Sequence, residues 1–513
     1  RGAYKAWIYQ HSIITRLSWP FFMHDFCRSF VTELQPTVNR YLRQWLGVYK
    51  SADEGVLYRS REHFGLKLAR ITAHFESMQI VKCHLLKNSQ DNNVRTLYLK
   101  RLKREEDFAR WTATKHLNTC ENIALHQNTF RGQSTRQGLG FSRYNNRPTS
   151  QEWRKLAVTI SRQLHQELYL SKAASLERQS AWTGWLDTAT PFDLSWKNMI
   201  YGHASADLIK FVLNASVNTV LTPALSALWG HKCNDSCPLC HGPNCTLHHI
   251  LSNCSTALAQ GRYSWRHDSV LTALHEVLQE LIDTRNNNNT KSRARPQYPD
   301  ISKCFVTAGK TAAKRPTSAK SDIMSTGNDW ELLIDYQYDP IVFLPEICST
   351  AERPDIIIWS RSTRTVILAE LTCPAEEGIK AAEIRKLARY NKELVPLITG
   401  QFPAWTVHLF TIEAGVRGFL AHSFRKFLSK IGLPKPIIRN TLNNVSAVLA
   451  TCNYRNQSNN TDKWNNRPPL TLSVMVLCLY LFCLLCRGLR LFLCSLLLHF
   501  DTLGARPNTT LWP

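Results

Sequence analysis

Strand-forming runs occur in only one part of this chain, residues 326–435. The runs are rich in β-branched residues and are DIIIW at 355–359, TVILAEL at 365–371 and WTVHLFTI at 405–412. Two helical patterns alternate with them, at about 376–395 and 416–430. Strands that alternate with helices form compact α/β domains, so we expect residues 326–435 to fold as one such domain.

The remainder of the chain reads as mainly helical, with two low-complexity stretches. Apolar residues recur at helical spacing in 5–48, and a very basic helical pattern follows over 60–130. We therefore predict a multidomain protein with a mostly α-helical N-terminal half and a C-terminal α/β domain. Its predicted segments are a helical unit (1–60), a basic helical region (61–230), a Cys/His unit with a following helix (231–283), a disordered basic linker (284–325), the α/β domain (326–435) and a disordered and hydrophobic tail (436–513).

The charge of the chain favours a polyanionic partner. Lys and Arg number 63 against 39 Asp and Glu, a formal net charge of +24. Phosphate contacts by such side chains release condensed counterions, which favours nucleic acid. A merely basic surface or an anionic membrane partner is the alternative. The tryptophans of 151–230 are more typical of a helical core than of base-stacking platforms; they are Trp153, Trp182, Trp185, Trp196 and Trp229.

Cysteines gather where a metal-binding unit is expected. The first thirty residues have no apolar signal-peptide core, so the 16 cysteines do not indicate a secreted disulfide scaffold. A Cys-x2-Cys pair, Cys237 and Cys240, precedes His249 and Cys254. Four such ligands suit structural zinc with no open coordination position. His248 is an alternative to His249, and Cys233 or Cys245 is an alternative cysteine ligand.

Two acidic residues accompany neighbouring predicted strands. Asp355 opens the first strand, and Glu370 lies near the end of the next. Adjacent strands can bring such carboxylates onto one Mg2+ ion, which prefers oxygen ligands and retains waters. A metal-bound water can attack a phosphodiester. Glu346 is a candidate third acid.

A cation is also expected near these carboxylates. Lys386 shares one helix face with Ala382 and Tyr390, and a helix that follows the Glu370 strand can aim this face at the acids. Three other basic residues of this helix compete for the role, and they are Lys380, Arg385 and Arg389. The alternative is that these residues have no catalytic role: Arg-Pro-Asp would form a turn, and Glu370 would be a solvated residue at a strand end.

The string RPDIII…VILAELTCPAEE…EIRKLARY resembles the restriction-like endonuclease of one class of non-LTR retrotransposons, within the PD-(D/E)xK superfamily. CPLC…HHILSNC resembles the CCHC zinc knuckle that precedes this nuclease, with one more residue before His249 than the family leads us to expect. KAWIYQHSIITRLSWPFFMHDF resembles the thumb that follows a reverse transcriptase palm. The resemblance covers about residues 1–435 and extends to GRYSWRHDSVL and EAGVRGFLAHSFRK.

The resemblance implies roles for particular residues. Asp355 and Glu370 would be Mg2+ ligands and Lys386 the catalytic lysine, displaced onto the helix because Thr372 occupies the ordinary lysine position. Residues 1–60 would be a thumb remnant, and Zn2+ would hold the knuckle. Arg353, Arg385 and Arg389 are candidates for contact with nucleic acid.

The implied activity is Mg2+-dependent nicking of target DNA, whose freed 3′-hydroxyl primes reverse transcription. The implied partners are target DNA and element RNA in the nucleus, with no small-molecule substrate. No Tyr/Phe-x-Asp-Asp motif occurs, so polymerase catalysis is not expected of this chain.

Two alternatives follow from the ends of the chain. It begins at Arg1 and has an anomalous tail, which motivates a decayed copy that binds nucleic acid through the knuckle and basic helices without cutting. The apolar run at 470–498, interrupted by Arg487 and Arg490, is borderline for a membrane span. We interpret it as translation past the reading frame rather than as a membrane anchor.

Overall fold

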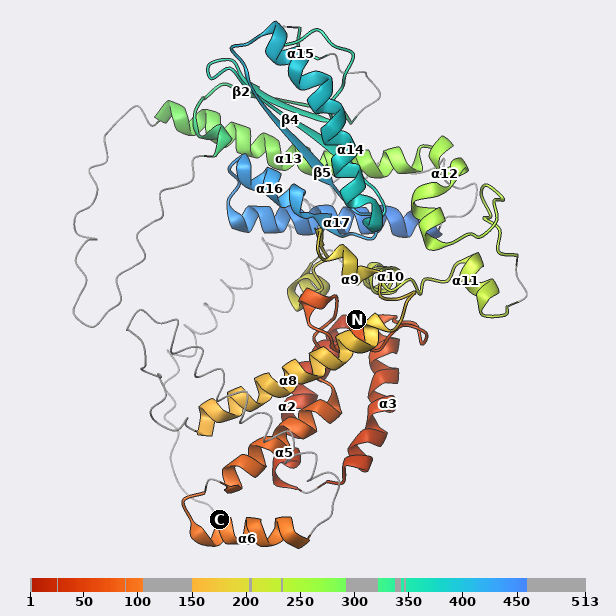
Figure 1. Ribbon diagram of the computed structural model, residues 1–513, viewed down its shortest axis with the longest axis vertical. Helices are drawn as coiled ribbons and strands as arrows, with labels where there is room; N and C mark the ends of the chain where they lie inside the picture. Colours follow the sequence, from red (N-terminus) through yellow and green to blue (C-terminus); the bar gives the residue numbers. More distant parts are fainter. Residues whose placement is uncertain are drawn as a thin grey trace, which may run out of the picture. The chain divides into compact units, whose positions relative to one another are not determined.

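The computed structural model describes residues 2–24, 26–87, 89–104, 150–202, 205–231, 234–291, 322–336, 343–345 and 347–458. Within these ranges the chain is mainly helical and contains a small mixed sheet (Figure 1). None of the helices in the described ranges has the length and apolar content needed to cross a bilayer. The apolar run at 470–498 lies outside the described residues.

The mixed sheet has four strands in the order β2-β3-β4-β5. The strands are β2 (Trp330–Ile334), β3 (Ile356–Ser360), β4 (Thr365–Thr372) and β5 (Thr406–Glu413). β3 pairs antiparallel with β2 and β4, whereas β4 and β5 are parallel. The three predicted strands are confirmed. β2 was not predicted, because WELLI is short and mixes polar with apolar residues.

Helices cover both faces of this sheet (Figure 1). α14 (Ile379–Lys392) and α15 (Leu394–Gln401) connect the parallel strands and pack against one face. α13 (Arg262–Lys291), α16 (His422–Lys430) and α17 (Lys435–Ser458) cover the other. Because β3 and β4 are buried on both faces, they read in the sequence as continuous apolar runs.

The first half of the chain is built from helices and turns. Its elements are α1 (Gly2–Ile8), the π-helical turn η1 (Tyr9–Ile13), α2 (Ile14–Met23), α3 (Arg28–Leu46), α4 (Gly55–Tyr58), η2 (Arg61–His63), α5 (Ile71–Lys87), α6 (Asn92–Arg104), α8 (Ser150–Ala174), α9 (Trp182–Trp185), η3 (Lys197–Tyr201), α10 (Ala206–Ser216) and α11 (Pro223–Leu228). The helices expected over 5–48 are confirmed, with an interruption where the chain turns before α3. Trp182 and Trp185 are core residues as predicted, whereas Trp229 is exposed.

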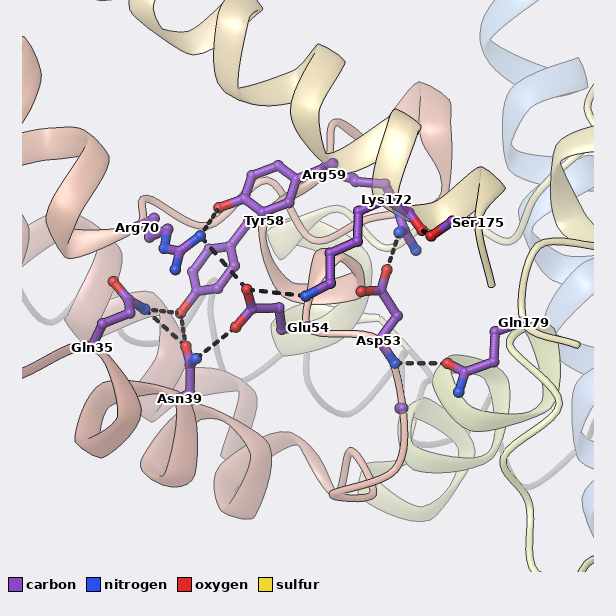
Figure 2. Close-up of polar contacts among 12 residues, drawn as sticks. Gln35, Asn39, Asp53, Glu54, Tyr58, Arg59, Arg70, Lys172, Ser175 and Gln179 are labelled. Atoms are coloured by element: carbon purple, nitrogen blue, oxygen red, sulfur yellow. Dashed lines mark hydrogen bonds and ion pairs between the residues drawn. The ribbon is translucent and has the colours of Figure 1, made fainter. Parts of the chain in front are cut away.

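A polar network ties the helical half together (Figure 2). Glu54 accepts a hydrogen bond from Asn39 at 2.9 Å and faces Arg70 and Lys172 at 3.6 and 3.7 Å. Beside it, Arg59 forms a fully buried ion pair with Asp53 and stacks over Trp182, 4.6 Å from the ring centroid. These contacts join α3, the α4 turn and α8 into one core.

The core of the helical half extends into the α/β domain. A short antiparallel pairing joins β1 (Ala189–Thr190) to β6 (Leu420–Ala421). The Phe419 ring packs at a tilt against Phe64 and edge-to-face against Trp185, with ring centroids 5.6 and 5.3 Å apart. The segments predicted as separate domains therefore share apolar contacts.

Two predicted segment boundaries were wrong. Residues 284–291, which were expected to belong to a linker, instead continue α13 to Lys291. Asn286 explains part of this continuation, since its side chain bonds both the N–H and the carbonyl of Trp330 at 3.0 Å. A short 3-10 turn, η6 (Ile323–Ser325), occupies the end of the expected linker.

The tail expected to be disordered from 436 instead begins with α17. This helix buries apolar residues such as Val445 and Leu449 against the sheet layer, together with Asn453 and Asn456. Polar residues on its buried face obscure the apolar periodicity that would have predicted a helix.

Candidate metal centre and carboxylate site

The predicted cysteine and histidine ligands come together in one cluster. Cys237, Cys240, His249 and Cys254 each offer one ligand atom, and these atoms lie within 4.8 Å of one another. The Cys237 and Cys254 sulfurs are 3.9 Å apart, and Cys240 Sγ lies 3.3 Å from His249 Nε2. Tetrahedral zinc, with bonds of about 2.0–2.3 Å, separates its ligand atoms by roughly 3.3–3.8 Å. The donor set therefore fits a metal ion such as zinc.

Tight turns present the two halves of this cluster. The Cys237 N–H donates to Gly242 O, and the His241 N–H to Cys237 O, both at 2.8 Å. His249 begins the π-helical turn η4 (His249–Asn253), and Cys254 follows it, just before α12 (Ser255–Ala259). This π-helical turn brings His249 and Cys254 into the same cluster of ligand atoms.

Within this cluster the environment favours the thiolate of Cys237, whereas burial raises the pKa of Cys254 to about 11. Although burial opposes the Cys237 thiolate, backbone N–H groups of Cys240 and Leu239 lower the pKa of Cys237 to about 6. Burial and the neighbouring Cys237 raise the pKa of Cys245 to about 12. A metal-bound cysteine must be deprotonated. Cys245 lies beside the cluster but is not among the four residues whose ligand atoms gather within 4.8 Å of one another.

The alternative histidine points elsewhere. His248 Nδ1 lies 2.7 Å from Glu377 Oε1, on the 3-10 turn η7 (Glu376–Gly378) that precedes α14. This ion pair lowers the pKa of Glu377 to about 2. Cys233, the other alternative, lies outside the described residues.

Asp355, the residue just before β3, lies opposite Glu370 on β4. The register pairs Ile356 with Ala369, which sets Asp355, one residue earlier, across from Glu370. Asp355 Oδ2 accepts a hydrogen bond from the Leu371 N–H at 2.6 Å. Glu370 shares the sheet face of Val366 and Leu368, which α14 covers.

α14 supplies the partners of Glu370. Lys386 Nζ forms an ion pair with Glu370 Oε1, and the Tyr390 hydroxyl donates to Oε2 at 2.8 Å. Ala382 and Tyr390 are buried on the same helix face, which fixes the direction of Lys386. The expectation that this face turns toward the Glu370 strand is therefore met.

Burial dominates the electrostatics of Glu370. It raises the pKa of this carboxyl, and the charge of Asp355 raises it further, against the lowering effect of Lys386. A buried carboxyl whose ionisation is opposed by a neighbouring carboxylate stabilises an added cation. The chemistry of the pair therefore suits a divalent cation with oxygen ligands.

Sequence reasoning missed His267, which belongs to α13. Its Nε2 lies 3.4 Å from Asp355 Oδ2, and its Nδ1 lies 3.2 Å from Asp268 Oδ1. Burial lowers the pKa of His267, but hydrogen bonds to Asp268 and Asp355 outweigh this effect and raise it to about 11. The only available signal was the His-Asp pair in SWRHDSVL, within a helix assigned to another unit.

The other candidate residues lie outside the immediate contacts of Glu370. Lys380 pairs with Glu383 at 2.8 Å, and Arg389 pairs with Glu352 at 2.9 Å. Arg385 is exposed on α14, and Arg353 is exposed, with its charge acting on Asp335. Glu346 lies outside the described residues. Lys386 is thus the α14 cation that directly contacts Glu370.

The chain matches no protein-family model, and no curated protein matches it. Any function must therefore be inferred from the fold and from two groups of side chains. One is the Cys/His cluster of three thiols and an imidazole. The other is the Asp355–Glu370 pair with its lysine, tyrosine and histidine partners. Within the described ranges, the Cys/His cluster is the one gathering of three or more metal-ligand side chains.

Proposed function

We propose that this chain is a Mg2+-dependent DNA endonuclease of the restriction-like class, part of a retrotransposon protein. The observation that carries the proposal is the ion pair between Lys386 and Glu370, directly beside Asp355 on the neighbouring strand. Two carboxylates at the ends of paired strands and a lysine are the minimal set for metal-assisted phosphodiester hydrolysis. The proposed substrate is target DNA.

Asp355 and Glu370 would hold the Mg2+ ion. The ion would supply an acidified water and offset negative charge on the scissile phosphate. Asp355 is suited to this role because one of its oxygens is already fixed by the Leu371 N–H. Glu370 is fixed by Tyr390 on its second oxygen.

Lys386 would orient the attacking water and stabilise charge on the phosphate. Its side chain is one-quarter exposed (24%), whereas that of Glu370 is nearly buried (6%), so the ammonium borders the accessible side of the site. A positioned donor at developing negative charge contributes typically 10²–10³-fold. Thr372 occupies the ordinary lysine position on β4, which agrees with a lysine displaced onto the following helix.

The nick would serve target-primed reverse transcription, with the freed 3′-hydroxyl as primer and element RNA as template, in the nucleus. The helical half would correspond to a thumb remnant followed by a basic linker region. Zn2+ would occupy the Cys/His cluster, whose four protein ligands leave no position for substrate, so its role would be structural.

A second candidate function is nucleic-acid binding without cleavage. It is favoured by a pocket of about 80 Å³ between the loop before α5, α5 itself and α8. Lys67, Arg70 and Arg162 line this pocket together with two histidines, and no acidic residue lines it. Such a pocket suits a backbone phosphate, and a protein that only binds would use it.

The test compares the full chain with Asp355→Ala in nicking of supercoiled plasmid and in binding of the same DNA. We expect the substitution to abolish Mg2+-dependent nicking and to leave DNA binding intact. Nicking that persists undiminished in the variant contradicts the assignment. Salt-dependent binding by both proteins without any cleavage supports the second candidate.

A further inference from the structure

A single buried arginine connects the two clusters. Arg266, near the start of α13, donates from Nη1 to Leu251 O at 2.7 Å and from Nη2 to Cys373 O at 3.2 Å. Leu251 lies in η4, between the ligands His249 and Cys254. Cys373 directly follows β4, the strand that carries Glu370. The Arg266 guanidinium therefore connects η4, the turn that carries His249, to the end of β4, the strand that carries Glu370.

Neighbouring contacts fix the α13 end of this connection. The Tyr263 hydroxyl accepts from the Cys254 N–H at 3.0 Å and donates to Ile250 O at 3.1 Å. Arg266 lies over the Tyr263 ring, 5.1 Å from its centroid, and also donates to Asn453 Oδ1 on α17 at 2.8 Å. The side chains of Tyr263 and Arg266 thus anchor the start of α13 to η4 and Cys254.

A Cys/His cluster with a bound divalent metal would carry negative charge, and this charge would stabilise the buried position of Arg266. Three thiolates and a divalent ion carry a formal charge of −1. Arg266 is only 3% exposed, and it donates to two backbone carbonyls and to an amide oxygen. A buried cation needs compensating negative charge, so an anionic cluster beside α13 favours its burial.

The next residue in the chain reaches the carboxylate site. His267 Nε2 lies 3.4 Å from Asp355 Oδ2. Because Arg266 and His267 are adjacent on α13, a shift in one backbone position moves both side chains. The η4 turn is therefore connected to Asp355 by the Leu251–Arg266 hydrogen bond, the backbone from Arg266 to His267, and the contact of His267 with Asp355.

We propose that Arg266 is a positioning residue through which the metal-loaded Cys/His loop holds His267 on Asp355 and fixes the end of β4 beside Glu370. Loss of the metal releases Leu251, weakens the Arg266 contacts and lets His267 leave Asp355. That this affects DNA cleavage rests on the proposed function. The coupling itself concerns two sites of this chain and is measurable without cleavage.

The test is NMR of the histidine rings in the full chain, with the His267 signals assigned by His267→Gln. Asp355→Ala supplies the His267 signals in the absence of its partner, and bound zinc is measured for each protein. The variant is Arg266→Gln. The matched control is Arg285→Gln, another α13 arginine, which bonds Asp322 and Gly432 O at the far end of the helix.

We expect zinc-loaded Arg266→Gln to show the His267 signals of Asp355→Ala, and Arg285→Gln to show those of the unsubstituted chain. Chelation of zinc from the unsubstituted chain should produce the same shift. His267 signals that stay unchanged in zinc-loaded Arg266→Gln, or on chelation, overturn the proposal. If Arg266→Gln does not fold, Arg266→Lys replaces it. The lysine keeps the positive charge but cannot donate to both Leu251 O and Cys373 O. Unchanged His267 signals in zinc-loaded Arg266→Lys would also overturn the proposal. Absence of nicking with the expected shifts would instead count against the nuclease assignment alone.

Discussion

Lys386 on α14 forms an ion pair with Glu370 on β4, and Tyr390, one turn further along the helix, donates to the second oxygen of the same carboxylate. The helix thereby fixes both oxygens of a nearly buried acid. A lysine in this place can exchange its carboxylate for the phosphate of a substrate without a change of backbone. This relationship motivates the first prediction.

Replacement of Lys386 by Ala should reduce the Mg2+-dependent nicking rate by about 100-fold or more, because a positioned charge at the reaction centre is lost. The matched control is Lys380→Ala on the same helix, where the lysine pairs with Glu383 rather than with Glu370. Single-turnover nicking rates measure both. Equal nicking rates for the two variants would contradict a catalytic role for Lys386.

The Cys/His cluster should bind one zinc ion per chain. We expect Cys254→Ser and His249→Ala to lose the metal, since each removes one ligand of a closed set. Chelation should lower the melting temperature, because a metal that binds only the folded state stabilises it. Elemental analysis and thermal unfolding measure these effects.

Cys245→Ala is the control for the metal site. Cys245 is buried beside the cluster but is not one of the four residues whose ligand atoms lie within 4.8 Å of one another. The variant should retain its zinc. Loss of the metal in this variant, with retention in Cys254→Ser, would replace Cys254 by Cys245 in the ligand set.

The sequence predicted those parts of the site that depend on local patterns. Apolar runs located β3 and β4, and therefore Asp355 and Glu370 at their ends, while the spacing of Ala382 and Tyr390 gave the direction of Lys386. His267 escaped prediction because its contact with Asp355 depends on how α13 packs across the sheet. No periodicity within a segment reports such a long-range contact.

The same limit explains the errors in segment boundaries. The Asn-rich end of α13 looks like a linker, but Asn286 is used to bond the backbone of β2. α17 carries Asn453 on its buried face, where the amide accepts a hydrogen bond from Arg266 and donates one to Val416 O. Buried polar residues with tertiary partners are indistinguishable in sequence from exposed ones.

Arg417 and Glu376 should make a large contribution to stability. Their side chains are 3% and 0% exposed and lie 2.8 Å apart, and Arg417 also covers the Trp185 ring at 4.8 Å. Arg417→Met leaves Glu376 as a buried unpaired charge and should lower the free energy of unfolding by about 3–5 kcal/mol. Urea unfolding measures the change. Glu383→Gln, which breaks an exposed pair, is the control and should have little effect.

Asp329 should make the α/β domain sensitive to acid. Its carboxylate accepts from the hydroxyl of Ser360 at 2.6 Å and from the Ser362 N–H at 2.7 Å. Burial opposes ionisation, but these hydrogen bonds outweigh it and lower the pKa of Asp329 below the ordinary 3.8.

A carboxyl whose folded pKa is lowered contributes stability above its unfolded pKa and loses it as the pH falls through the folded value. Asp329→Asn should therefore be less stable than the unsubstituted chain near neutral pH, with the difference shrinking below about pH 4. Urea unfolding at several pH values measures this. A difference that grows on acidification would contradict the assigned role of the carboxylate.

The most direct test of the nuclease assignment is incubation of supercoiled plasmid with the full chain, in Mg2+ or in EDTA. We expect relaxed circles with Mg2+ and unchanged supercoiled plasmid with EDTA. A folded chain that binds the plasmid and leaves it supercoiled in Mg2+ would contradict the nuclease assignment.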